Sequence, residues 1–177
     1  MSTTANPHGF VTRGIHWVSA ALVGFGYLKG LDSVSELADP AVLRFEVLYA
    51  LGIGLLFAIR FLWTKYVAGP TRLPKDAPRW EHYLSRAVHI GLYASVLGIV
   101  VSGLGIALAY SVPTFGGFVL TGWLALHELS LAILPVLLIG HVAGALWHKS
   151  VRRDGVLESM TGSFGHRYFV WRRVLRD

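Results

Sequence analysis

The chain contains no cysteine, which excludes disulfides, thiolate metal sites, iron–sulfur clusters and covalently attached haem c. Charge is also scarce: charged residues make up 15% of the 177 positions, against roughly 25% in soluble domains. No Lys, Arg, Asp or Glu occurs from Ala87 to Leu126 or from Leu129 to His148. Such runs exclude a disordered chain and are typical of membrane-spanning helices, which need roughly 20 apolar residues each.

Four apolar runs predict an all-α integral membrane protein that folds as one antiparallel bundle of four transmembrane helices. The connections between the runs are short or contain several prolines and glycines, as expected of exposed loops. We therefore expect a single domain over residues 1–177, with spans at 14–32, 41–63, 83–110 and 119–147 and a basic tail at 149–177.

The distribution of basic residues predicts the orientation in the bilayer. Lys and Arg gather between the second and third spans and in the tail, whereas the other two connections have little net positive charge. The positive-inside rule then places both termini and the second loop in the cytoplasm. The tail is either a surface helix on anionic lipid or a plain flank of positive charge. A net charge of +6 placed in this way argues for lipid and against nucleic acid as the partner.

Eight histidines are the strongest nitrogen ligands that the chain offers to a metal. His127 and His141 are 14 residues apart on one predicted helix, so they share a face about 21 Å apart. His16 lies near the start of the first span and His141 near the end of the fourth, which gives both residues the same depth near the cytoplasm. Two imidazoles facing each other across a bundle can form an axial pair for haem iron. A polar contact between helices, or another metal, is the alternative.

The second span contains two ionisable residues and no histidine. Glu46 lies toward its outer end, at the depth of His127, and Arg60 lies 14 residues later, toward the cytoplasm. Small residues near His16 and His141 leave room for a flat macrocycle, although ordinary helix packing uses the same residues. These small residues are Gly24, Gly26, Gly140 and Gly144.

From about Arg13 to Met160, the chain resembles the bacterial cytochrome b561 family of four-helix membrane cytochromes. The matching segments are Gly14–Ile15–His16–Trp17, Ala58–Ile59–Arg60–Phe61–Leu62, the segment around His89, His127–Glu128–Leu129, Ile139–Gly140–His141, and His148. The resemblance implies a bundle that encloses two b haems, the inner one held by His16 and His141. It assigns the outer haem to His127 and a histidine of the second helix, but Glu46 stands at that position. One or two b haems are therefore expected.

The resemblance also implies a function in the bacterial inner membrane. A membrane b-type cytochrome passes electrons between a donor and the quinone pool, with ubiquinone as substrate, and relatives include a superoxide:ubiquinone oxidoreductase. Other relatives are membrane anchors and electron conduits for a soluble dehydrogenase or hydrogenase, which would be a partner subunit. A haem-free bundle for proton or metal transport is the alternative from a different class.

Three further residues each have a functional interpretation and a simpler structural one. The resemblance places a quinone site at His148, which is otherwise an interfacial histidine. Arg60 is a candidate to neutralise a haem propionate, or a flanking positive charge. His89 makes a polar contact with neighbouring helices, or bonds a propionate or a quinone oxygen, or replaces a ligand.

Overall fold

The computed structural model of the protein describes residues 9–31, 33–68, 73, 77–112 and 117–162. Four long helices follow one another along the chain, and a short fifth helix ends the described part. Their bounds are α1 Phe10–Leu28, α2 Pro40–Trp63, α3 Arg79–Ser111, α4 Gly117–Trp147 and α5 Val156–Thr161. A 3-10 helix at Val34–Ala38 precedes α2, and π-helical turns at Thr64–Ala68 and His148–Arg152 extend α2 and α4. The expected all-α bundle is confirmed.

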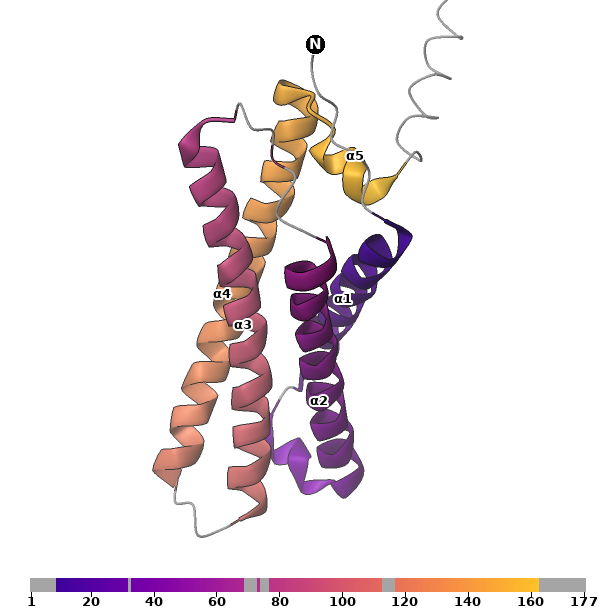
Figure 1. Cartoon of the computed structure of the whole chain (residues 1–177). Helices are drawn as coiled ribbons and strands as arrows, with labels where there is room; N and C mark the ends of the chain where they lie inside the picture. The colour runs from indigo at the N-terminus through magenta and orange to yellow at the C-terminus, as the bar shows by residue number, and fades with distance from the viewer. Residues whose placement is uncertain (1–8, 32, 69–72, 74–76, 113–116, 163–177) are drawn as a thin grey trace, which may run out of the picture.

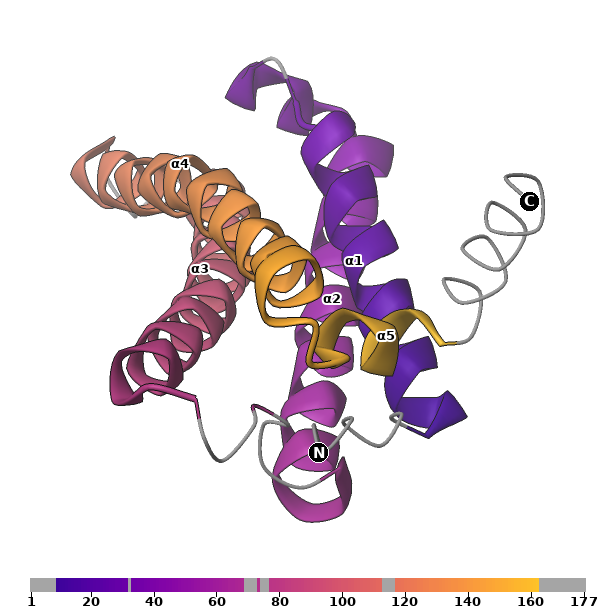
Figure 2. The ribbon, with the colours of Figure 1, turned by 90° about the horizontal axis from the view of Figure 1, so that it is seen from above.

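The long helices run antiparallel and form two neighbouring pairs, α1 with α2 and α3 with α4 (Figure 1). The most extensive contact is between α3 and α4, followed by that between α2 and α3. The α5 helix crosses the end of the bundle from α4 to α1, as the view along the bundle shows (Figure 2). The start of α1, the end of α2, the start of α3 and the end of α4 therefore lie at one end, which we call the tail end.

Side-chain caps determine where the 3-10 helix and α2 begin in the polar segment after α1. The Ser33 hydroxyl accepts a hydrogen bond from the amide of Ser35, and the Glu36 carboxylate accepts one from the amide of Ser33, so the 3-10 helix begins there. The Asp39 carboxylate then accepts a hydrogen bond from the Ala41 amide at 2.8 Å, and Pro40 occupies the first helical position.

Among the described residues, three helices are long and apolar enough to cross a membrane: 40–68, 79–111 and 117–152. The sequence predicted four spans, and α1 is the one with the weaker composition. Its 19 residues reach about 28 Å, which approaches the thickness of a bilayer core. However, Arg13, His16 and Ser19 lower its mean hydropathy. The helix ends at Leu28, before the predicted boundary at residue 32, which itself lies outside the described residues.

The small core lies between α2, α3 and α4, while most large apolar side chains point outward. Ile53, Val96, Val100 and Leu134 form the buried cluster. By contrast, Val136 and Ile139 on α4 are 68% and 69% exposed, and Leu55 on α2 is 65% exposed. An outward apolar surface of this extent is suited to lipid rather than water. Of the predicted basic tail, residues 163–177 lie outside the described part of the chain.

Candidate functional site

Four polar side chains, one from each long helix, meet between the helices toward the tail end of the bundle. We call this group, His16, Arg60, His89 and His141, the histidine cluster. The ring centres of His16 and His141 are 6.2 Å apart, and those of His89 and His141 are 5.0 Å apart. The Arg60 guanidinium donates a hydrogen bond to Nδ1 of His16 at 2.9 Å. The structure thus brings together the predicted inner pair, the predicted cation and a third histidine.

Hydrogen-bond chemistry assigns a tautomer to two of these rings. A guanidinium can only donate, so Nδ1 of His16 is the acceptor, and a neutral His16 carries its proton on Nε2. The carbonyl oxygen of Ser85 can only accept, so Nδ1 of His89 is the donor at 2.7 Å, and a neutral His89 has its lone pair on Nε2. A histidine that binds a metal through Nε2 commonly donates from Nδ1 in this way.

The surroundings of His141 fit a haem, which is the group that the histidine pattern predicts. Two imidazoles on opposite sides of one metal, each bonded at about 2.0 Å, have ring centres roughly 6 Å apart. The separation of His16 and His141 agrees with that value. A Cβ added at Gly24, Gly140 or Gly144 would meet nothing within 4 Å, and all three residues are exposed. Gly26, by contrast, packs against Tyr49, whose hydroxyl would lie 2.6 Å from an added Cβ, so this predicted small residue leaves no room for a macrocycle. Donor type and spacing suit the macrocycle.

At the other end of the bundle, the Glu46 carboxylate already has a partner. It lies 3.5 Å from the Lys29 ammonium, which also sits over the Phe45 ring at 4.2 Å. Together with Phe25, Gly26 and Tyr49, these residues line a cavity of about 20 Å³, which has room for about one water molecule. The Tyr49 hydroxyl donates a hydrogen bond to the Leu22 carbonyl and so ties α2 to α1.

His127, the predicted outer ligand, is engaged by α3. Its Nδ1 lies 2.8 Å from the Ser102 hydroxyl, and Ser102 is fully buried. A Cβ added at Gly103 would lie 3.6 Å from Cε1 of His127, an ordinary van der Waals distance, so α3 packs close to this ring. Among the described residues, His127 makes no ring contact with another histidine. Within the described residues, His127 and Glu46 form no hydrogen bond or ion pair, although they lie close enough to interact electrostatically.

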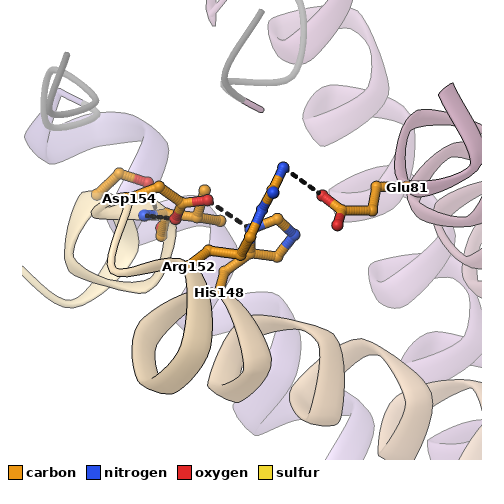
Figure 3. Close-up of polar contacts among 6 residues, drawn as sticks. Glu81, His148, Arg152 and Asp154 are labelled. Atoms are coloured by element: carbon orange, nitrogen blue, oxygen red, sulfur yellow. Dashed lines mark hydrogen bonds and ion pairs between the residues drawn. The ribbon is translucent and has the colours of Figure 1, made fainter. Parts of the chain in front are cut away.

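His148, the predicted quinone residue, lies in the turn after α4 and is buried. Its Nδ1 is 2.6 Å from Oδ2 of Asp154 (Figure 3). In the same turn, the Arg152 guanidinium lies 3.1 Å from the Glu81 carboxylate of α3. His148 is thus part of a buried polar group rather than an isolated residue at the membrane surface.

Sequence reasoning missed three partners of the predicted residues. His89 was expected to make a polar contact, but its ring is closer to His141 than the ring of His16 is. Ser102 and Asp154 were given no role. The available signals were a serine inside the uncharged part of α3 and an acid near the start of a basic tail.

Comparison with known proteins gives one match. A protein-family model described as prokaryotic cytochrome b561 matches residues 8–163, which is most of the chain. No curated protein and no solved structure matches. The match spans all five helices, including the four that carry the histidine cluster. The chain therefore belongs to the prokaryotic cytochrome b561 family, and it is a helical membrane b-type cytochrome that binds haem b and transfers electrons.

Proposed function

We propose that the protein carries electrons from a donor to membrane quinone through a single inner haem b held by His16 and His141. The histidine cluster is the observation that carries this proposal, because four helices converge there with two imidazoles at the separation of an axial pair. The haem supplies one-electron chemistry, and the protein supplies its axial nitrogens and an apolar setting.

If His16 were to hold the haem iron through Nε2, its imidazole proton would have to lie on Nδ1, and Arg60 would lose its present acceptor. Arg60 would then be a suitable cation for a haem propionate. In the observed position, the Arg60 guanidinium lies 5.8 Å from the ring centres of Phe57 and Tyr93, which stabilise a cation there.

Only one bis-histidine site is proposed because the outer residues have other partners. Glu46 is paired with Lys29, and His127 is hydrogen-bonded to Ser102. A carboxylate is also a poor counterpart to imidazole in a low-spin b haem.

We expect the purified protein to contain about one non-covalent, six-coordinate haem b per chain. Haem quantified per chain, with the visible absorption spectrum of the reduced protein, measures this directly. A protein that stays colourless when it is produced with ample haem would contradict the cytochrome proposal. Two equal low-spin haems would contradict the single-site version alone.

The identity of the electron donor distinguishes two versions of this function, a stand-alone enzyme and a subunit of a larger complex. As a superoxide:ubiquinone oxidoreductase, the purified chain is reduced by superoxide without a partner, and ubiquinone reoxidises it. As an anchor for a soluble dehydrogenase or hydrogenase, it is reduced only when that partner is added. Anaerobic and superoxide-generating assays with the isolated protein distinguish the two.

The proposed site of action is the bacterial inner membrane, with both termini in the cytoplasm. We expect an alkaline phosphatase fusion after Asp177 to be inactive and a fluorescent-protein fusion there to fluoresce, because uncompensated Lys and Arg gather in the second loop and tail. A matched pair of fusions after Ala38, in the first loop, should show the opposite pattern. Phosphatase activity at Asp177 would overturn this orientation.

A further inference from the structure

The chain reverses direction just after α4 and lays α5 across the tail end of the bundle. Arg153 and Gly155 adopt left-handed backbone conformations, with φ of 53° and 79°. The Trp17 indole donates a hydrogen bond to the Met160 carbonyl at 3.2 Å, which attaches α5 to α1. This reversal buries Asp154 beside His148, just after the end of α4.

Both oxygens of the Asp154 carboxylate are held in place. Oδ2 lies 2.6 Å from Nδ1 of His148, and Oδ1 accepts a hydrogen bond from the Val156 amide at 3.2 Å. The side chains of His148 and Asp154 are only 11% and 10% exposed. An ionised carboxylate only accepts hydrogen bonds, so Nδ1 of His148 keeps a proton in this contact. Proton gain and loss is then confined to Nε2, which points away from Asp154 (Figure 3).

We infer that Asp154 is a positioning residue that holds His148 as the proton donor to the bound quinone. The inference rests on the proposed function, in which quinone is the electron acceptor. Quinone becomes quinol by taking up two electrons, delivered one at a time by the cytochrome, and two protons. His148 gives one proton as its Nε2–H bond breaks and a quinone O–H bond forms. Water supplies the second proton and then restores the first to His148.

The turn after α4 does not depend on the His148–Asp154 contact alone for its position, because a second ion pair attaches the same turn to α3. Arg152 is paired with Glu81 of α3, whose side chain is only 6% exposed. The Arg152 and Glu81 side chains are within ion-pair distance, but they are not aligned for a hydrogen bond. Other charged groups on these elements include Glu158 on α5 and Arg13 on α1, each with a buried atom that lacks a hydrogen-bond partner. Lys149 and Arg153 lie in the turn itself, and Arg79 and Arg86 lie on α3. Imidazole is the group among these that exchanges protons near neutral pH.

The test measures how fast quinone reoxidises the haem of full-length, haem-loaded protein that has been chemically reduced. Decylubiquinone is mixed in without oxygen between pH 5.5 and 9, and the rate and its dependence on quinone concentration are recorded for wild type and Asp154→Asn. Asparagine has the same shape and can still accept from the Val156 amide, but it cannot stabilise an imidazolium by charge. The expected result is a roughly tenfold slower maximal rate and a lower pH midpoint, because the carboxylate that favours the protonated imidazole is gone, with an unchanged haem spectrum.

Two more variants separate positioning from anchoring. Asp154→Glu retains the carboxylate and should bring the pH midpoint back toward the wild-type value. Glu81→Gln removes the other ion pair of the turn and should leave the pH profile unmoved. The inference is overturned if Asp154→Asn keeps the wild-type profile, or if Glu81→Gln reproduces its shift. A wild-type haem that decylubiquinone does not reoxidise would overturn the proposed quinone function, and the role of Asp154 with it.

Discussion

Replacing His141 with alanine should remove the haem. His141 contacts both other rings of the histidine cluster, so its loss breaks the His16–His141 pair and the contact with His89. Outer-shell partners of metal-binding histidines alone contribute 10–100-fold to affinity, so loss of the ligand should weaken haem binding by more than about 100-fold. Haem per chain and the low-spin resonance signal of the purified variant are the measurements. His127→Ala, on the same helix, is the matched control and should keep its haem.

Two companion variants identify the residue opposite His141. His16→Ala should lose the haem or leave it high-spin, since the proposed pair then has one nitrogen. His89→Ala should remain six-coordinate. The tautomer of His89 suits coordination through Nε2, whereas His16 would first have to lose its hydrogen bond from Arg60. The two variants therefore distinguish His16 from His89 as the axial partner of His141. A high-spin His89→Ala with a normal His16→Ala would make His89 the axial partner and His16 a neighbour of the site.

Replacing Glu46 with histidine should create a second, outer low-spin haem. The substitution removes the carboxylate that pairs with Lys29 and supplies an imidazole on α2 at the depth where the family pattern has one. His127 must also turn away from Ser102, so Glu46→His combined with Ser102→Ala should load more fully than Glu46→His alone. Haem content is expected to rise from about one toward about two per chain.

Glu46→Gln is the matched control, because it abolishes the ion pair without adding a ligand. It should leave the haem content unchanged and should lower stability by no more than about 1 kcal/mol, because Lys29 and Glu46 are partly exposed. If wild type already holds two equal bis-histidine haems, or if Glu46→His gains none, the assignment of the outer site is wrong.

The sequence by itself determined the architecture. The uncharged stretches in α3 and α4 have too few polar groups to be stable in water, and their length requires helices in a bilayer. The 14-residue interval between His127 and His141 placed both residues on one face of α4 through helix geometry alone. The start of α2 also depends on local contacts, since the Asp39 carboxylate accepts a hydrogen bond from the Ala41 amide and Pro40 occupies the first helical position.

Only the tertiary structure decided which polar groups meet. His89 and His141 are on helices whose relative rotation about their axes depends on packing, including contacts such as Ser102 with His127. No interval along the chain encodes that rotation, so the third histidine of the cluster and the Arg60–His16 hydrogen bond were not predictable. The sequence did expose Glu46 as a departure from the family pattern, but its pairing with Lys29 required the end of α1 to lie beside the start of α2.

The environment of His148 shows the same division. Its place at the end of an apolar run followed from the sequence, whereas its burial against Asp154 depends on a chain reversal through two left-handed residues. The left-handed conformation of Arg153 is unfavourable for a residue with a side chain, and nothing in the identity of Arg153 predicts it. The docking of α5 on α1 and the ion pair of Arg152 with Glu81 stabilise that reversal, and these are contacts between segments far apart in the chain.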